Sequence, residues 1–270
     1  MGSRTLVASV VLATCLLAAP ASAKKIDVGG HRLYCEIRGK GEALAVFDSG
    51  LGDTHEVWRW VWPDVAKFAR VFLYDRGGLG RSEPGPAPRS SERLVEELHT
   101  LLAAAGLPGP YVLVGHSFGG LNMQLFASRY PGEVRGLVLI EPTPIEYPAR
   151  EPELLSEQDL AKLTTSIGAS SAGVRLEREA VGISAEQVRA ARPFPPHAVT
   201  LISSTRPEVT PAFQSAWLEM QKHLAEELDA RLHLITSRSG HYIQFDAPHL
   251  VIEAIRTASL TPVSVPASER

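Results

Sequence analysis

Six short apolar runs, separated by segments long enough to form helices, constrain the fold of this chain most strongly. The runs are ALAVF at 43–47, VFLY at 71–74, YVLV at 111–114, GLVLI at 136–140, AVTLIS at 198–203 and LHLIT at 232–236. Continuous apolar runs of this length are typical of strands that are covered on both faces. The alternation of strand-like runs with helix-length segments therefore predicts an α/β protein with a mostly parallel, doubly wound sheet.

An antiparallel hairpin is expected ahead of these runs. The segments KIDV and RLYCEI flank the pair Gly29-Gly30, and a two-residue spacing of this kind favours a tight turn. Cys35 lies in the second of these segments and is interpreted as a packed strand residue. A nucleophilic role is disfavoured because no glycine-flanked turn accompanies it.

Apolar residues at helical spacing fill the gaps between the runs. Trp58, Val61, Trp62, Val65 and Phe68 form one such set, and further helices are expected behind Ser90-Ser91, along one face from Phe213 to Leu228, and around LVIEAI at 250–255. The tryptophans of the first set are expected in the core rather than in a binding site.

The alternation of strand and helix breaks after Ile140. Residues 142–197 contain many prolines and no strand-like run, and helix-start signals stand at Ser156 and Ser184. We interpret this stretch as a small helical cap insertion. The length of 270 residues then suits one principal domain at 24–270.

The charge balance argues against a nucleic-acid partner. The chain has 27 Lys and Arg against 30 Asp and Glu, a net charge of −3, and no basic run that would follow a phosphate backbone.

The first 23 residues have the layout of a secretory signal peptide. Arg4 precedes an apolar stretch that ends in ASA before two lysines, so we expect cleavage after Ala23 and a secreted or periplasmic protein. An uncleaved membrane anchor is disfavoured because the apolar stretch is too short, so no stable membrane insertion is expected after cleavage. A lipoprotein would use Cys15, but Thr14 stands where a smaller residue is expected.

The segment Gly115-His116-Ser117-Phe118-Gly119 matches a nucleophile elbow, in which a serine lies on a sharp turn between a strand and a helix. YVLV precedes it and LNMQLFASRY continues it as a plausible helix. Glycines are needed two residues to either side, because a side chain there would collide with the neighbouring strand or helix.

A serine nucleophile needs a base within hydrogen-bond reach. His241 is the best candidate of the nine histidines, because it lies on a loop after the last strand run, where the carboxyl edge of the sheet is expected. His116 is adjacent to the serine, but neighbouring side chains on a sharp turn point apart. We expect it to be a supporting residue.

The chain resembles the α/β-hydrolases. The resemblance rests on the Gly-His-Ser-Phe-Gly-Gly elbow, on YDRGGLGRSEP after the preceding strand, on the loop DSGLGDTHEVW and on SGHYIQFDAPHLVIEAI at the end, and it covers roughly residues 30–258. It implies an α/β-hydrolase fold with Ser117 as nucleophile and His241 as general base, in the chain order nucleophile, acid, histidine.

The resemblance places the acid after one of two later strands. Glu141 follows GLVLI directly and is preferred over Glu208, which stands well beyond the end of the next run. Alternatively, Glu141 is a solvated carboxylate at a strand end. Asp246 lies near His241 but directly precedes the last helix, so it is interpreted as the cap of that helix.

Two backbone donors for the oxyanion are implied at Leu51 and Phe118. The first lies in SGLG, where Ser49 replaces the commoner histidine, which puts the side-chain support of this loop in doubt. The glycines of YDRGGLGRS lack the geometry of a phosphate cradle and are interpreted as a turn at the sheet edge. Histidines and carboxylates at metal-ligand spacing are missing, so neither a cofactor nor a metal is expected.

The sequence thus predicts an exported serine hydrolase that cleaves a small-molecule carboxylic ester through an acyl-enzyme. An aminopeptidase-like amide hydrolase would use the same residues, and would need a carboxylate in the pocket to hold a free amine. A catalytically silent binding protein on the same fold is the third hypothesis. Dehalogenases and epoxide hydrolases of this family carry an aspartate at the elbow, so Ser117 argues against both.

Overall fold

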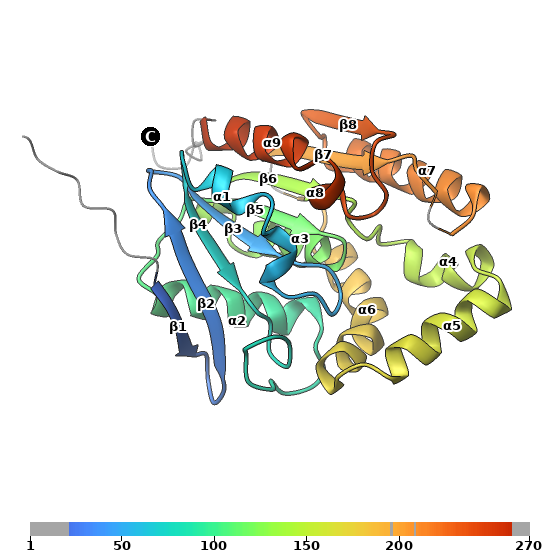
Figure 1. The fold of residues 1–270 in the computed structure, drawn as a ribbon, viewed down its shortest axis with the longest axis horizontal. Helices are drawn as coiled ribbons and strands as arrows, with labels where there is room; N and C mark the ends of the chain where they lie inside the picture. Colours follow the sequence, from blue (N-terminus) through green and yellow to red (C-terminus); the bar gives the residue numbers. More distant parts are fainter. Residues whose placement is uncertain (1–21, 195–196, 208, 261–270) are drawn as a thin grey trace, which may run out of the picture.

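The strands of the structure, a computed structural model that describes residues 22–194, 197–207 and 209–260, follow the apolar runs of the sequence (Figure 1). Their bounds are Ser22–Asp27 (β1), Arg32–Gly39 (β2), Leu44–Asp48 (β3), Arg70–Tyr74 (β4), Tyr111–His116 (β5), Val134–Ile140 (β6), Ala198–Ser204 (β7) and Leu232–Thr236 (β8). They form one sheet in the order β1-β2-β4-β3-β5-β6-β7-β8. The pairs β1–β2 and β2–β4 are antiparallel, and the others are parallel. The predicted mostly parallel sheet is confirmed.

Helices cover both faces of this sheet (Figure 1). Their bounds are Trp62–Val65 (α1), Ser91–Ala104 (α2), Phe118–Arg129 (α3), Tyr147–Leu154 (α4), Glu157–Gly168 (α5), Ala172–Ala190 (α6), Pro211–Glu227 (α7), Ile243–Asp246 (α8) and Pro248–Leu260 (α9), with 3-10 turns at His55–Trp58 (η1) and Pro131–Glu133 (η2). Apolar residues of α2, α3, α6 and α7 pack on one face, and those of α1, α8 and α9 pack on the other.

The central strands are buried on both sides, as their unbroken apolar runs indicate. In β3, Leu44 and Val46 belong to the cluster under α2 and α3, whereas Ala45 and Phe47 belong to the cluster under α9. Successive side chains of a strand point to opposite faces, so a strand between two layers of helices needs an apolar residue at every position.

The N-terminal ribbon turns at the predicted glycine pair. The Val28 amide donates to the His31 carbonyl at 3.0 Å, which leaves Gly29 and Gly30 as the two turn residues. Both have positive φ, 110° and 100°, a conformation that glycine adopts without strain. The Asp27 carboxylate accepts from both glycine amides and fixes the turn.

The first predicted helix is shorter than expected. Trp58, Val61 and Val65 are fully buried, but the chain forms the 3-10 turn η1 and then a single helical turn, α1. The reason is Pro63, which lacks an amide hydrogen and fits only the first turn of a helix. A continuous helix from 58 to 68 was therefore the wrong expectation, although the burial that motivated it is present.

Three helices, α4 to α6, occupy the stretch between β6 and β7 (Figure 1). Ser156 caps α5 by accepting from the Asp159 amide, as the sequence predicted. Ser184 does not start a helix, and this prediction was wrong: α6 begins behind Ser171 and continues through Ser184. The Ser184 hydroxyl is buried and accepts from the Ser91 amide at 2.9 Å, so it caps α2 instead of its own helix.

Residues 1–21, which hold most of the predicted signal peptide, lie outside the described residues, and Ser22 and Ala23 begin β1. Among the helices that the structure does describe, none has the length and apolarity needed to span a membrane.

Cys35 is fully buried in β2, and burial raises the pKa of its thiol to about 11. We expect this thiol to be inert, because only the thiolate reacts and the raised pKa keeps the thiol protonated near neutral pH. Its burial also keeps reagents away from the sulfur atom. In a Cys15→Ser background, Ellman's reagent at pH 8 should leave the native protein unlabelled and label one thiol after denaturation in guanidinium. Rapid labelling of the native protein would contradict the packing of β2.

Candidate active site

Ser117 lies on a strained turn between β5 and α3. Its φ of 51° and ψ of −118° lie outside the regions that side-chain-bearing residues ordinarily adopt. Two backbone hydrogen bonds hold the turn, from the Ser117 amide to the Ile140 carbonyl at 3.1 Å and from the Thr143 amide to the Ser117 carbonyl at 3.0 Å. The turn is therefore fixed by the neighbouring strand β6 and by the chain that follows it.

The glycines of the elbow are required by close backbone contacts. A Cβ atom on Gly115 would lie 2.6 Å from the Gly119 carbonyl oxygen, and one on Gly119 would lie 2.4 Å from the Asp48 carbonyl oxygen. Both distances are shorter than Cβ atoms tolerate. The elbow thus fits against itself and against the end of β3 only with glycine at these positions.

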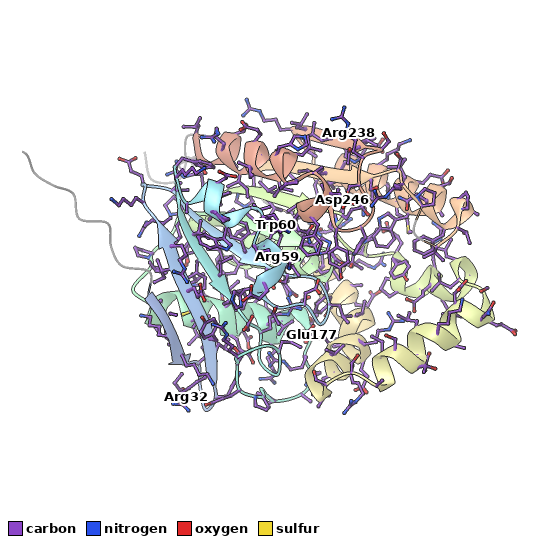
Figure 2. All side chains as sticks on the ribbon, viewed as in Figure 1. Arg32, Arg59, Trp60, Glu177, Arg238 and Asp246 are labelled. Atoms are coloured by element: carbon purple, nitrogen blue, oxygen red, sulfur yellow. The ribbon has the colours of Figure 1, made fainter. Side chains whose placement is uncertain are left out.

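His241 lies on the loop between β8 and α8. The Asp246 carboxylate supports this loop, because it accepts from the Gly240 amide and the Ser239 hydroxyl, each at 3.4 Å, and forms an ion pair with Arg206. Asp246 is the last residue of α8 (Figure 2), so its interpretation as the cap of α9 was wrong. Its side chain points back toward the loop rather than toward the first amides of α9.

Glu141 follows β6 directly and is 2% exposed, so it is not a solvated carboxylate at a strand end. One carboxylate oxygen accepts from the Ser204 amide, and the other accepts from the Trp217 indole N–H at 2.6 Å. The second oxygen also lies 3.6 Å from His241 Nδ1. Glu208, the other candidate acid, lies outside the described residues.

The five residues predicted from the sequence, Ser117, His241, Glu141, Leu51 and Phe118, all line one pocket of about 290 Å³. All five follow the carboxyl ends of parallel strands, namely β3, β5, β6 and β8, where ligands bind in open α/β sheets. The cap and α7 form the rest of the wall, with the side chains of Thr143, Tyr147, Glu151, Leu163, Ile167, Arg178, Val181, Val209, Phe213, Gln214 and Trp217.

Ser49 provides the side-chain support that was in doubt for the loop carrying Leu51. Its hydroxyl donates to the Thr54 carbonyl at 3.0 Å and accepts from the buried Trp58 indole N–H, also at 3.0 Å. A single hydroxyl therefore ties both ends of the turn to the core. Phe118 is the first residue of α3, where backbone amides have no partner within the helix.

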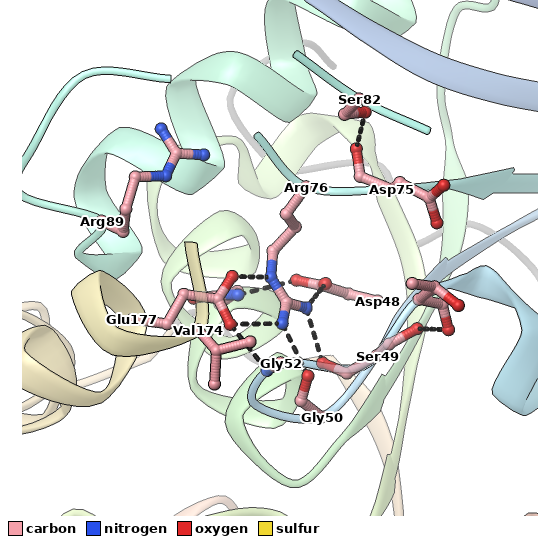
Figure 3. Close-up of polar contacts among 12 residues, drawn as sticks. Asp48, Ser49, Gly50, Gly52, Asp75, Arg76, Ser82, Arg89, Val174 and Glu177 are labelled. Carbon is pink, nitrogen blue, oxygen red and sulfur yellow. Dashed lines mark hydrogen bonds and ion pairs between the residues drawn. The ribbon is translucent and has the colours of Figure 1, made fainter. Parts of the chain in front are cut away.

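Arg76, from the YDRGG segment, is a residue of the site that sequence reasoning missed (Figure 3). It is 2% exposed and lies between the carboxylates of Asp48 and Glu177, each with a contact of 2.6 Å. Burial by itself would lower the pKa of Arg76, but these two charges outweigh it and hold the pKa well above its usual value. The only available signal was that an arginine two residues beyond a buried strand is expected to be buried and then needs anionic partners.

Trp217 and His116 also support the site. Trp217 lies in the helix predicted from Phe213 to Leu228, and its indole N–H donates to Glu141 while its ring lies edge-on to His241 at 6.0 Å. His116 is buried, and its Nε2 is 3.0 Å from the His241 carbonyl oxygen. Burial holds the pKa of His116 well below its usual value. Because a carbonyl oxygen can only accept, the His116 ring donates this hydrogen bond from Nε2. This geometry agrees with the supporting role expected for His116.

Within the described residues, one group has the spacing of a metal site, and it lies apart from the pocket lining. Glu146, His223 and Glu227 bring ligand atoms within 4.8 Å of one another, but His223 is exposed and Glu227 also pairs with Arg192.

Comparisons with known proteins agree with this architecture. A family model described as the alpha/beta hydrolase fold matches residues 46–166. The uncharacterized protein YqjL of Bacillus subtilis (strain 168) is 32% identical over 120 residues, which are 44% of this chain and 47% of YqjL. The chain thus spans less than half the length of such curated relatives.

Solved structures match over much more of the chain. Cfl2 from Burkholderia cenocepacia aligns with a TM-score of 0.66 and 18% identity over 88% of this chain and 95% of that protein. An E-2-(acetamidomethylene)succinate hydrolase aligns with a TM-score of 0.63 and 19% identity over 88% and 98%. At these identities the likeness concerns the fold. Together with the family match across the elbow and the preceding strands, it shows that this chain has the alpha/beta hydrolase fold.

Proposed function

We propose that this chain is an exported serine hydrolase that cleaves a small carboxylic ester through an acyl-enzyme. The alpha/beta hydrolase fold supports a hydrolytic enzyme. The observation that carries the finer proposal is the set of contacts around one pocket: a serine on a strained elbow, a histidine at the facing loop, and a buried carboxylate 3.6 Å from the Nδ1 atom of that histidine.

In the proposed acylation, Ser117 Oγ attacks the ester carbonyl while His241 Nε2 takes the hydroxyl proton. Glu141 faces Nδ1, which selects the tautomer with hydrogen on Nδ1 and stabilises the imidazolium that forms. The separation of 3.6 Å is that of an ion pair, and catalytic hydrogen bonds often shorten only once substrate is bound.

The amides of Leu51 and Phe118 would bind the oxyanion of the tetrahedral intermediate. When this intermediate collapses, the ester C–O bond breaks and His241 returns its proton to the leaving alcohol. Water then attacks the acyl-enzyme, again with His241 as base, and releases the carboxylic acid and free Ser117. No cofactor enters these steps.

The pocket favours a compact, apolar substrate group. Tyr147 lies edge-on to Trp217 at 5.1 Å, and Phe213 stacks on Trp217 at 5.9 Å, so three aromatic rings form one wall. Leu163 and Ile167 of α5 add aliphatic surface. A volume of about 290 Å³ is at the small end for ligand pockets, which suits a short acyl or aromatic group better than a long fatty chain.

The aminopeptidase alternative is weaker on this geometry. Besides Glu141, the pocket lining contains one carboxylate among the described residues, that of Glu151. It already accepts the Tyr147 hydroxyl at 2.7 Å and forms an ion pair with Arg178. A substrate ammonium would have to displace a charged partner, so an ester is favoured over a peptide with a free amine. The silent binding protein is disfavoured because the Glu141 carboxylate lies in ion-pair reach of His241.

Export remains part of the proposal and rests on residues 1–23. Cleavage after Ala23 would leave Lys24 as the first residue and retain Lys24–Asp27 of β1, which pairs with β2 from Cys35 to Arg32. A mature chain that begins at Lys24 therefore keeps the antiparallel pairing of β1 with β2.

We expect Ser117→Ala and His241→Ala each to lower turnover of p-nitrophenyl esters by about 10⁴-fold or more, and the double variant to lose little beyond that. The reason is that the two residues act as one unit in the proposed mechanism. Steady-state rates over esters of rising acyl length measure this, and a fluorophosphonate probe should label the wild type but not Ser117→Ala. A folded wild type that the probe leaves unlabelled would count against the enzyme.

Glu141→Gln should lower kcat by about 10³- to 10⁴-fold. Both carboxylate oxygens accept hydrogen bonds from N–H donors, of Ser204 and Trp217, and glutamine offers only one acceptor oxygen for the two. Its amide also fails to stabilise the imidazolium of His241.

The matched control is Glu208→Gln, the same change at the other candidate acid, and it should keep wild-type kcat. Full turnover in Glu141→Gln together with its loss in Glu208→Gln would show that the acid has been assigned to the wrong residue.

A further inference from the structure

All five N–H donors of the Arg76 guanidinium find an acceptor (Figure 3). Nε and one Nη2 hydrogen bind the two oxygens of Glu177, at 2.6 and 2.9 Å. Nη1 binds Asp48 Oδ1 at 2.6 Å and the Ser49 carbonyl at 2.7 Å, and Nη2 also binds the Gly50 carbonyl at 2.6 Å. The two carbonyls are those directly before Leu51.

The bond to the Gly50 carbonyl determines where the Leu51 amide points. The Gly50 C=O and the Leu51 N–H belong to one planar trans peptide, in which the two groups point in opposite directions. Because Arg76 binds the oxygen, the hydrogen faces away from Arg76. Leu51 lines the same pocket as Ser117. The proposed oxyanion contact needs the Leu51 hydrogen on the pocket side, and therefore the Gly50 oxygen on the side of Arg76. A flipped peptide would present a carbonyl oxygen to the oxyanion instead.

Arg76 also contacts the other proposed donor residue. Its guanidinium lies 5.6 Å from the centre of the Phe118 ring, in cation–π geometry. One buried side chain therefore touches both halves of the oxyanion site, the loop after β3 and the start of α3.

Glu177 connects this arrangement to the cap. It comes from α6, and it is fully buried (Figures 2 and 3). Besides binding Arg76, its Oε2 accepts from the Gly52 amide at 2.9 Å, just beyond Leu51. The loop is thus held before Leu51 by Arg76 and after it by Glu177.

From these contacts we infer that Arg76 is a positioning residue for the oxyanion site, that it keeps the Gly50–Leu51 peptide in its donating orientation, and that Glu177 of the cap completes this hold. The inference rests on the proposed function, because it concerns the same reaction. It assigns a role in transition-state stabilisation to two residues that do not touch the substrate.

The test compares Arg76→Lys and Glu177→Gln with matched changes in a second buried pair. A lysine has three N–H donors at one point, so it cannot reproduce the fork that binds both carboxylates and both carbonyls. Arg89 and Glu97 form the control pair: they are also buried, with contacts of 2.6 and 2.7 Å, and neither lines the pocket. Arg89→Lys and Glu97→Gln therefore report the effect of a weakened buried pair alone.

We expect Arg76→Lys to lower kcat for a p-nitrophenyl ester by about 10- to 100-fold while KM stays within about threefold, because a misaligned oxyanion donor weakens the transition state rather than substrate binding. Affinity for a trifluoromethyl ketone, which forms a tetrahedral adduct with serine, should fall by the same factor. Glu177→Gln should lower kcat by about tenfold, the factor for one hydrogen bond to a charged group. Both control variants should lower Tm and leave kcat within about twofold of wild type.

The inference is overturned if Arg76→Lys and Glu177→Gln lose no more kcat than the controls, or if KM rises while affinity for the ketone is unchanged. Should Arg76→Lys fail to fold, Glu177→Gln alone decides. The Ser117→Ala variant separates this from the proposed function. If the wild type hydrolyses the ester and Ser117→Ala does not, a negative result concerns Arg76 only; if the two are equally inactive, the proposed function fails and the inference with it.

Discussion

The approach of Gly119 to the end of β3 is the contact on which the site depends. The Gly119 backbone lies against the carbonyl oxygens of Asp48 and Ser49, too close to admit a side chain. This approach sets the first turn of α3 beside the loop that carries Leu51, so the elbow and the loop form one wall of the pocket. The backbone conformation of Ser117 costs about 1–3 kcal/mol. The Gly119 contact holds the turn on one side, and hydrogen bonds to Ile140 and Thr143 hold it on the other.

Buried charge organises the rest of the site. Arg76 is matched by Asp48 and Glu177, and the carboxylate of Glu141 is matched by N–H donors and His241. Removing one member of such a pair costs about 3–5 kcal/mol, because its partner is left buried and unpaired. These buried pairs therefore hold the loop after β3 and the Glu141 carboxylate in fixed positions.

The cap helix α6 is part of this fixed framework. Ser184 and Gln187 accept from the first amides of α2, each at 2.9 Å, while Glu177 reaches the loop after β3. Helix α6 thus bridges α2 and the loop after β3. The outer helices α4 and α5 contribute to the lining of the pocket, including Tyr147 and Leu163.

Much of this could be read from local sequence, and the reason is physical. Strands buried on both faces leave unbroken apolar runs, and the elbow glycines leave a fixed spacing, so both the sheet and the turn at Ser117 were predictable. The contacts that were missed join distant residues. Glu177 lies 101 residues from Arg76, and Trp217 lies 76 residues from Glu141. The wrong predictions concerned three local patterns. Pro63 ends the first predicted helix early. Ser184 caps α2 instead of starting a helix, and Asp246 binds the loop of His241 instead of capping α9.

The central claim is that Ser117 forms a covalent acyl-enzyme, and trapping that intermediate tests it most directly. The wild-type protein would be mixed with a p-nitrophenyl ester, quenched in acid within milliseconds, and its intact mass and peptide masses measured. We predict an increase equal to one acyl group, located on the peptide that contains Ser117, with a burst of p-nitrophenol of matching size. Ester turnover with no acyl adduct on that peptide, or an adduct on another residue, would contradict it.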